Sequence, residues 1–322
     1  MEFKHTNEEL KYLQALPLDL KIAKTKLRIV EFYEHYNGNV AVSFSGGKDS
    51  TVLLHIAREL YPEVKGVYCD TGLEFPEVKA HVKSFDNIDI IRPRMSFKQV
   101  IDEIGWVYPS KDTARTVHYA KKGSKWALNK FKGLNSDGTP SKFKQRYKKW
   151  SFLVDAPFKI SDECCNIMKK KPFHEYKRAL GGGMIVGTMA GESALRKNAW
   201  LQKGCNAFED GQSKPMSFWT EQDVLQYIVD RNIKIPTVYG DIVKVDGKWT
   251  TTGEHRTGCM WCPIGCHLDK DENRFQRMAR THPKIYDYCM NQLGMAEFLD
   301  YIGVDYKPKE KQPTLFEGGD KP

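Results

Sequence analysis

The sequence lacks long apolar runs, internal repeats and a recognisable secretory leader. None of its apolar runs approaches the roughly 18 residues needed to cross a bilayer, and its first residues are polar and charged. A leader would need an apolar stretch near the N-terminus. We therefore expect a cytoplasmic protein that does not contact membranes, in a compartment that keeps thiols reduced.

Composition sets the size of the core and the sign of the charge. The 322 residues are 40% hydrophobic and 12% aromatic, which suffices for one large core and a smaller appendage. Lys and Arg total 50 against 41 Asp and Glu, giving a net charge of +9. This excess is a modest indication of a polyanionic partner.

The most informative segment is residues 43–50, which read SFSGGKDS. The apolar run at 40–44 predicts a buried strand, and apolar residues at helical spacing from Val52 to Leu60 predict a helix that ends before Pro62. Strand, glycine turn and helix thus follow one another in the order of a phosphate-binding loop.

The residue types of this loop suit an anion. Gly46 and Gly47 permit backbone angles closed to other residues and let amide N–H groups approach a ligand. The positive end of the helix dipole adds to the attraction. Ser45 and Ser50 offer hydroxyl donors, and Lys48 can follow charge developing on a leaving phosphate. A glycine turn without a ligand is the alternative interpretation.

The loop does not have the Walker spacing, but S-G-G-K-D-S resembles the pyrophosphatase loop S-G-G-x-D-S of the PP-loop family. That family includes ATP sulfurylases, tRNA-thiolating enzymes and phosphoadenylyl-sulfate (PAPS) reductases. The resemblance implies an α/β fold with a doubly wound parallel sheet, like the adenine nucleotide alpha-hydrolases. It also implies ATP with Mg²⁺ at the loop, and Lys48, Asp49 and Ser50 as catalytic residues.

Further segments agree with this family. After a predicted strand at 64–69, residues 70–77 read DTGLEFPE and resemble the D-T-G-x-x-F-P-E sequence of sulfurylase and reductase relatives. Loops at the carboxyl ends of parallel strands share one crevice. Asp70 is therefore expected to contact Mg²⁺ or ribose, or alternatively to cap a helix.

Predicted strands at 88–91 and 184–186 extend the sheet. Residues 187–193, GTMAGES, resemble the reductase segment G-x-R-x-x-E-S, with Met189 in place of arginine. Arg196 is expected to supply the missing anion contact, unless it is a solvated surface residue. The expected nucleotide contacts are Ser43, Ser45, Gly46, Gly47, Lys48, Asp49, Ser50, Asp70, Thr71, Gly187, Thr188 and Arg196.

The eight cysteines are unevenly placed. In a reducing compartment the C-x-x-C spacing favours metal ligation or redox work over structural disulfides. A tandem pair cannot easily reach two corners of a zinc tetrahedron, whereas an iron–sulfur cubane offers separated irons. The tandem pair is Cys164-Cys165, the cluster is Cys259, Cys262 and Cys266, and the single residues are Cys69, Cys205 and Cys289.

A tandem pair followed at long range by C-x-x-C resembles the [4Fe-4S] ligand set of adenylyl-sulfate (APS) reductases. Lys169 and Pro172 match their C-C-x-x-x-K-x-x-P neighbourhood. The resemblance implies Cys164, Cys165, Cys259 and Cys262 as ligands, with Cys205 and Cys266 in reserve. Structural zinc and unliganded thiols remain open, and Cys69 and Cys289 are expected to be core thiols.

The complete loop favours cleavage of ATP between the α and β phosphates. Many sulfonucleotide reductases lack S-G-G-K-D-S and carry a nucleophile in a C-terminal E-C-G-x-H segment, whereas Cys289 is the last cysteine here. We expect adenylylation of a nucleic-acid acceptor for iron–sulfur-assisted sulfur transfer, of the DNA phosphorothioation or tRNA thiolation type, with a cysteine desulfurase or other sulfur donor. Alternatives are a PAPS/APS reductase using a cluster-adjacent thiol, and a nucleic-acid-binding protein that senses nucleotide.

A basic insertion at about 111–150 favours nucleic acid as the partner. It interleaves aromatic residues with many cations against only two acids, Asp112 and Asp137, and 135–138 predicts an exposed turn. A solvated basic face with aromatics packed beneath is the alternative. Its cations are Lys111, Arg115, Lys121, Lys122, Lys125, Lys130, Lys132, Lys142, Lys144, Arg146, Lys148 and Lys149.

The sequence predicts four regions. Residues 1–37 are helical, 38–230 form the nucleotide-binding domain, 231–306 form a small cysteine-containing cap, and 307–322 form a disordered tail. Thr220 is expected to begin a helix with Asp223 in the capping position. In the tail, Gln312-Pro313-Thr314-Leu315-Phe316 resembles the Q-x-x-L-F peptide that docks on bacterial sliding clamps.

Overall fold

The computed structural model describes residues 3–142, 147–269 and 271–308, which fall into two compact units. Unit 1 contains Met1–Ser96 and Asn166–Cys259, and unit 2 contains Phe97–Cys165 and Met260–Pro322. The sequence-based boundaries at 37, 230 and 306 do not coincide with this division. The Gln312-to-Phe316 peptide lies outside the described residues, as does the predicted tail beyond residue 308.

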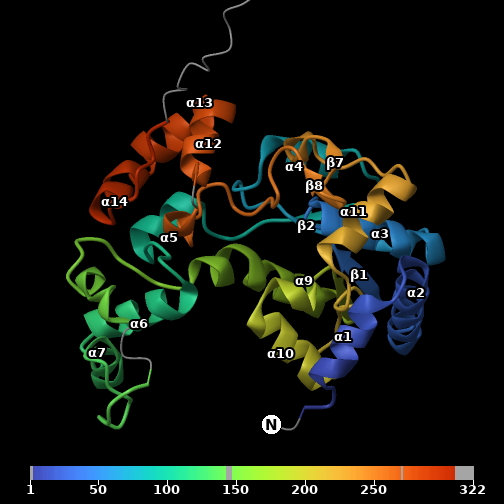
Figure 1. The fold of residues 1–322 in the computed structure, drawn as a ribbon, viewed down its shortest axis with the longest axis horizontal. Helices are drawn as coiled ribbons and strands as arrows, with labels where there is room; N and C mark the ends of the chain where they lie inside the picture. The colour runs from blue at the N-terminus through green and yellow to red at the C-terminus, as the bar shows by residue number, and fades with distance from the viewer. Residues whose placement is uncertain (1–2, 143–146, 270, 309–322) are drawn as a thin grey trace, which may run out of the picture. The chain divides into compact units, whose positions relative to one another are not determined.

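Unit 1 is built on a sheet that has six strands within the described residues (Figure 1). The order is β3-β2-β1-β4-β6-β5, and every neighbouring pair is parallel except β5 and β6. The predicted α/β class and the four predicted strands are thereby confirmed. The strands are β1 (Val40–Ser43), β2 (Lys65–Cys69), β3 (Ile88–Ile91), β4 (Gly183–Val186), β5 (Asn206–Ala207) and β6 (Gln212–Ser213).

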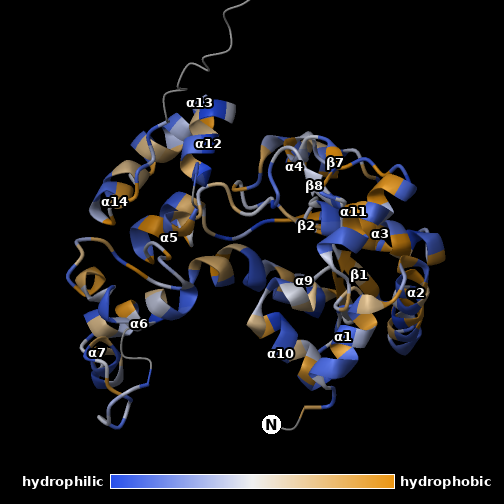
Figure 2. Ribbon diagram, in the orientation of Figure 1, coloured by the Kyte–Doolittle hydropathy of each residue, from blue (hydrophilic) through white to orange (hydrophobic). Residues whose placement is uncertain are grey.

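Helices cover both faces of this sheet, because alternate residues of β1 point to opposite sides. Val40 and Val42 join a core that includes α2 and α3, whereas Ala41 packs with Val67 and Met184 against α9. Figure 2 shows β1 as largely hydrophobic, as expected for a strand buried on both faces.

The sheet is flanked by long and short helices of unit 1. The bounds are α1 (Asn7–Ala15), α2 (Leu18–His35), α3 (Lys48–Leu60), α4 (Pro76–Lys83), the π-helical turn Asn166–Lys170, α9 (Lys171–Leu180), the 3₁₀ turn Ala190–Glu192, α10 (Ala194–Lys203), α11 (Glu221–Asp230) and the 3₁₀ turn Thr237–Tyr239. The N-terminal region is helical, as predicted. Thr220 caps α11 in a capping box with Asp223, also as predicted.

A two-stranded hairpin follows α11 in unit 1. Its strands are β7 (Ile242–Val245) and β8 (Lys248–Thr251), joined by Asp246 and Gly247, both with positive φ. The Gln222 side chain holds Trp249 by two 2.8 Å bonds, donating to its carbonyl and accepting from its amide. The hairpin is thus fixed to the first turn of α11, which positions the segment that follows β8.

Unit 2 is helical and is held together largely by aromatic side chains. Trp106 stacks on Phe298 at a centroid distance of 4.8 Å, and Tyr301 donates to the Phe152 carbonyl at 3.2 Å. The 97–165 and 260–308 segments therefore share one core. The elements are α5 (Phe97–Glu103), α6 (Lys111–Lys121), α7 (Lys125–Phe131), α12 (Arg274–Thr281), α13 (Pro283–Asp287) and α14 (Met295–Tyr301), with short turns at Ser151–Val154, Cys266–Leu268 and Tyr288–Gln292.

In the part of the chain described, we find no helix with the length and apolarity that membrane crossing requires.

Candidate active site

The loop between β1 and α3 is held in shape by glycine and by its own serines. Gly46 has φ +75°, and a Cβ there would lie 2.6 Å from Val82 Cγ2, so no other residue fits without displacing α4. The Ser45 amide donates to Ser50 Oγ at 3.1 Å, and Ser50 Oγ donates to the Gly47 carbonyl at 2.9 Å. These bonds turn the chain directly into the first turn of α3.

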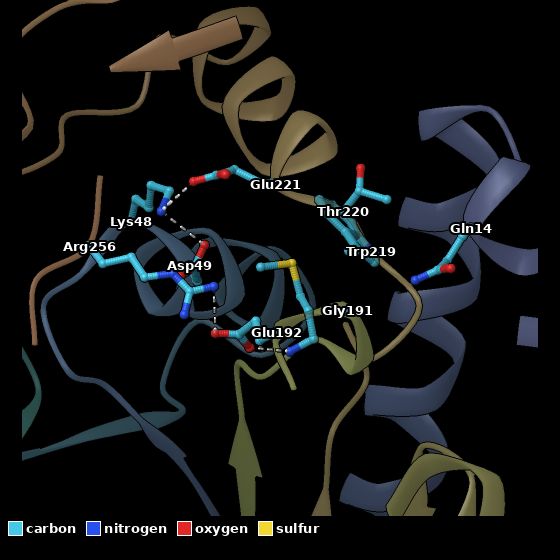
Figure 3. Close-up of a pocket in the computed structure, with 10 residues that line it drawn as sticks. Gln14, Lys48, Asp49, Gly191, Glu192, Trp219, Thr220, Glu221 and Arg256 are labelled. Atoms are coloured by element: carbon cyan, nitrogen blue, oxygen red, sulfur yellow. Dashed lines mark hydrogen bonds and ion pairs between the residues drawn. The ribbon is translucent and has the colours of Figure 1, made fainter. Parts of the chain in front are cut away.

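Lys48 is nearly fully buried, with 3% of its surface exposed. Its Nζ lies 3.2 Å from Glu221 Oε1 and donates to the His255 carbonyl at 3.0 Å. Figure 3 shows the ammonium group between Glu221 and Asp49, whose Oδ1 is 3.8 Å away. The exposed Glu221 carboxylate is therefore the close charged partner of the Lys48 ammonium group. An anionic ligand would have to compete with Glu221 for this ammonium group.

Tyr239 covers the amide side of the loop. Its hydroxyl accepts from the Lys48 amide at 3.1 Å and lies 2.8 Å from Thr257 Oγ1. A Cβ on Gly47 would come within 3.0 Å of both hydroxyls. The segment around the β7–β8 hairpin thus packs directly on the loop, and the Lys48 amide has a neutral hydroxyl as its partner.

Asp49 forms only a long ion pair with Lys48, at 3.8 Å. Its Oδ1 is buried and has no hydrogen-bond partner. Burial raises the pKa of Asp49 although Lys48 opposes the shift, and Glu221 raises it further. Such an orphaned carboxylate oxygen is suited to a cation.

A cavity of about 270 Å³ opens beside these residues. Figure 3 shows Lys48, Asp49, Glu221 and Arg256 around it, with Gln14 and Trp219 farther along its wall. The cavity is thus surrounded by two cations and three carboxylates. These charges can orient a charged ligand, but they do not determine which anion binds. Its lining residues are Gln14, Lys48, Asp49, Met189, Gly191, Glu192, Trp219, Thr220, Glu221 and Arg256.

Two arginines meet at Glu192. Arg196 forms an ion pair with Glu192, and Arg256 lies 3.8 Å from its other oxygen. Only Arg256 is among the residues that line the cavity. Met189 lines it as well, where the family resemblance placed arginine. The cation at this wall is therefore Arg256, which the sequence analysis missed, while the expected Arg196 lies behind Glu192.

Asp70 and Thr71 occupy the carboxyl end of β2 but not the cavity lining. Asp70 pairs with Lys79 at 2.8 Å and with Arg92 at 3.6 Å. Burial alone would raise its pKa, but Lys79 and a bond from the Gly72 amide hold the pKa of Asp70 below its usual range. Asp70 does not cap α4, whose N-cap is Phe75. Its oxygens are thus occupied by cations of the protein.

Three further residues expected to contact the nucleotide, Ser43, Gly187 and Thr188, lie outside the cavity lining. A Cβ on Gly187 would lie 3.3 Å from the Asp49 carbonyl, so β4 and α3 approach closely there. Ser43 is the last residue of β1, and the Thr188 amide donates to the Val186 carbonyl. None of these three lines the cavity.

The cysteines are all reduced in the structure, which describes every one of them. Burial raises the pKa of Cys69 and of Cys266 to about 12; Cys259 adds to the first shift and Cys262 to the second. Among the residues described, no three His, Cys, Asp or Glu side chains are arranged to hold a metal ion.

The expected cluster ligands are divided between the units: Cys164, Cys165 and Cys262 belong to unit 2, and Cys259 ends unit 1. Ligation of a cluster by these four cysteines therefore stays a prediction, and we derive no chemical step through one. Of the reserves, Cys266 is buried in unit 2, and Cys205 lies in unit 1 beside Trp200.

In the basic insertion, cations lie on aromatic rings. Lys130 Nζ is 5.1 Å from the Trp126 centroid and 4.9 Å from that of Tyr147, and Lys149 lies 4.9 Å from Trp150. Tyr147 is buried, at 7% exposed, whereas Trp126 and Trp150 are half-buried. The 135–138 turn is exposed, as predicted. Nucleic-acid binding here remains a prediction, and Phe143, Lys144 and Arg146 lie outside the described residues.

Fold and loop together define a nucleotide-binding α/β protein of the PP-loop type. The family model "Phosphoadenosine phosphosulfate reductase domain" matches residues 39–106 and 106–265, well over half of the sequence. The chain belongs to this family, and the resemblance inferred from residues 45–50 is confirmed.

The relatives include named enzymes and proteins without an assigned role. An adenosine 5'-phosphosulfate reductase of Bacillus cereus is 22% identical over 251 residues, covering 77% of this chain and 84% of that enzyme. Sulfate adenylyltransferase subunit 2 of Streptomyces lavendulae is 24% identical over 222 residues, 66% of this chain and 61% of that protein. An uncharacterized protein of Methanocaldococcus jannaschii is 23% identical over 289 residues, 85% of this chain and 53% of that protein. The chain spans about half the length of this last relative.

Among solved structures, the FMN adenylyltransferase of Candida glabrata aligns with a TM-score of 0.38 and 13% identity, covering 71% of this chain and 63% of that one. This likeness is too slight to bear on function.

Proposed function

We propose that the chain binds ATP at residues 45–50 and transfers its adenylyl group to an acceptor, releasing pyrophosphate. One observation carries the proposal. A complete S-G-G-K-D-S loop presents buried Lys48 at the start of α3, beside a cavity that also holds Arg256. The backbone amides, the ammonium group and the guanidinium are donors that suit a departing pyrophosphate.

The residues have separable roles in such a reaction. The acceptor oxygen attacks the α-phosphorus, the bond between that phosphorus and the α–β bridging oxygen breaks, and pyrophosphate leaves with the bridging oxygen. Lys48 and Arg256 would balance the charge that grows on this leaving group. Glu221 would have to leave Lys48 when phosphate arrives, because both compete for one ammonium group.

Asp49 fits Mg²⁺ better than the expected Asp70. Asp49 lines the cavity and its Oδ1 accepts no hydrogen bond, whereas Asp70 is outside the lining and pairs closely with Lys79. Bound Mg²⁺ would supply Lewis-acid polarisation of phosphate oxygens. Asp49 would hold it with one carboxylate, the usual protein contribution to magnesium sites.

The acceptor is proposed to be nucleic acid, modified by sulfur in the manner of DNA phosphorothioation or tRNA thiolation. Once an acceptor oxygen carries the adenylyl group, AMP becomes a good leaving group, and sulfur from a desulfurase or similar donor can displace it. The support is the exposed lysines of the basic insertion, since such charges neutralise phosphates. Ligation of a [4Fe-4S] cluster by Cys164, Cys165, Cys259 and Cys262 also remains a prediction.

Reduction of APS or PAPS is the second candidate, because relatives named as APS reductases align with 77% of the chain. Against it, Cys289 is fully buried, and burial raises the pKa of its thiol. A buried thiol of raised pKa is a poor nucleophile. A reductase would therefore need another thiol, such as the partly exposed Cys262.

Two assays separate the candidates. Exchange of labelled pyrophosphate into ATP, measured with Mg²⁺ and tRNA or DNA present, is expected for wild type and is expected to be lost in Lys48→Met. Sulfite release from APS or PAPS without exchange would replace the proposal with the reductase. Salt-sensitive nucleic-acid binding with neither activity would leave a nucleotide-sensing binding protein.

A further inference from the structure

We propose that unit 1 has a second ligand site, a pocket for a small aromatic anion of the nucleoside monophosphate kind. The pocket lies between α1, α2 and α10 and has a volume of about 430 Å³. We call it the α2–α10 pocket (helices labelled in Figure 1). It shares no residue with the cavity beside Lys48, and its size lies in the range of small-molecule sites.

Its lining includes three cations, Lys24, Arg28 and Lys203, against one acid, Glu9. Lys24 and Arg28 lie one turn apart on α2, and Lys203 reaches the pocket from the end of α10. Arg28 is paired with Glu31 at 2.6 Å and Lys203 with Asp210. Lys24 has no ion pair with any residue that the structure describes. An uncompensated cation beside two others favours an anionic ligand.

A buried indole N–H adds a second, independent indication. Trp200 is 3% exposed and lines the pocket, yet its Nε1 has no hydrogen-bond partner. The adjacent Cys205 thiol interacts with this N–H, but sulfur is only a weak acceptor. Burial raises the pKa of that thiol, an effect that the indole, Arg28 and Lys24 oppose. A buried donor without an acceptor is costly, and an oxygen of a ligand in the pocket would satisfy it.

Four aromatic side chains, His5, Tyr12, Trp200 and Phe208, form another part of the wall. His5 stacks on Trp200 at a centroid distance of 4.8 Å, and the His5 amide donates to the Leu201 carbonyl, which ties the N-terminal segment to α10. Tyr12 is 69% exposed and Phe208 is 36% exposed, and both line the pocket. Phe208 also packs on His35, so Tyr12 offers the most exposed ring, and a ring of this kind beside cations matches a ligand with an aromatic ring and a negative group.

The test uses AMP as the probe and isothermal titration calorimetry on the full chain carrying Lys48→Met, which weakens the loop site. AMP is expected to bind this protein once. Adding Lys24→Ala is expected to weaken that binding about tenfold, because a charge-assisted contact is lost. Adding Trp200→Phe, which keeps a ring against His5, is expected to weaken it about fivefold.

Matched controls define the contrary results. Lys11→Ala removes an exposed lysine of α1 outside the pocket and is expected to leave AMP binding unchanged. Adenosine and inorganic phosphate are each expected to bind more weakly than AMP. The proposal is overturned if the Lys48→Met protein binds no AMP, if Lys24→Ala and Lys11→Ala bind AMP equally, or if adenosine matches AMP. Because the loop site is weakened equally in every protein compared, the differences between variants report on the α2–α10 pocket and do not depend on the proposed adenylyl transfer.

Discussion

Gly46 is the residue on which the backbone of the phosphate loop most directly depends. Two obstacles oppose any larger residue there. The φ of Gly46 is +75°, and an added Cβ would lie only 2.6 Å from the Val82 side chain. Gly72 has nearly the same φ, +76°, but a Cβ there would meet nothing within 4 Å. Alanine substitutions at Gly46 and Gly72 therefore distinguish the cost of backbone strain from the cost of steric overlap.

We expect Gly72→Ala to lower the free energy of unfolding by about 1–2 kcal/mol, from strain at positive φ. Gly46→Ala is expected to cost about 1–3 kcal/mol more, because α4 must also move. Urea denaturation of the two variants and wild type measures both changes. Equal losses of unfolding free energy in the two variants would show that the Val78 and Val82 side chains can move aside at no energetic cost.

Glu221 is the internal competitor for Lys48. Glu221→Gln removes the carboxylate 3.2 Å from Nζ, and we expect it to tighten binding of a non-hydrolysable ATP analogue about three- to fivefold. Glu209→Gln, an exposed change elsewhere in unit 1, is the control and is expected to have no effect. Weaker binding by Glu221→Gln, measured by calorimetry, would mean that Glu221 assists the ligand instead.

His81 should make the protein sensitive to mild acid. It contacts Thr51 of α3 at 3.2 Å, and burial lowers the pKa of His81 from 6.5 to about 4. The unfolded chain then binds a proton more readily than the folded one, so stability is lost as the pH falls from 6.5 towards 4.

His81→Gln removes this titration and keeps a polar group near Thr51. Denaturation midpoints at pH 7 and pH 4.5 are expected to differ less for the variant than for wild type. An identical fall in both proteins would place the acid sensitivity on other groups.

At the scale of elements, local patterns predicted the scaffold, and contacts distant in sequence completed the site. The strands that pair as β1, β2 and β4 were visible because strands buried on both faces form short apolar runs, and β3, the edge strand, was visible from its three isoleucines. Tyr239 and Arg256 were missed, since the loop that they reach lies roughly two hundred residues earlier and no local pattern reports such a contact. The Asp246-Gly247 turn was a usable signal for the β7–β8 hairpin that positions them.

A buried ion pair joins α2 to α11. Lys21 is 2% exposed, and its Nζ lies 2.6 Å from Asp223 Oδ2 and donates to the Gln14 carbonyl at 2.7 Å. We expect Lys21→Met to destabilise the protein by about 3–5 kcal/mol, because Asp223 is left buried without its cation.

The exposed pair of Lys65 and Asp89, at 3.2 Å, provides the comparison. Lys65→Met is expected to cost less than about 1 kcal/mol. Adding Asp223→Asn to Lys21→Met should recover part of the larger loss. Thermal unfolding measures all four proteins, and similar losses for Lys21→Met and Lys65→Met would contradict the account.

At the scale of the whole molecule, two of the places where the chain passes between units fall at cysteines. Cys165 ends one segment of unit 2, and Cys259 ends unit 1. If these thiols hold a cluster, anaerobically purified protein is expected to contain about four irons with matching sulfide. Cys262→Ser is expected to lose them, and Cys289→Ala, which changes a buried thiol outside the set, is expected to keep them. Zinc in place of iron, unaffected by Cys262→Ser, would overturn the predicted cluster.

The central claim is that a triphosphate binds against the amides and ammonium group of residues 45–50. A crystal structure of the full chain with Mg²⁺ and an ATP analogue that resists cleavage between its α and β phosphates tests it most directly. The account predicts phosphate oxygens within hydrogen-bonding distance of the loop amides and Lys48 Nζ, with Glu221 displaced. A loop left without phosphate, with Glu221 still on Lys48 and the analogue bound elsewhere, would contradict it.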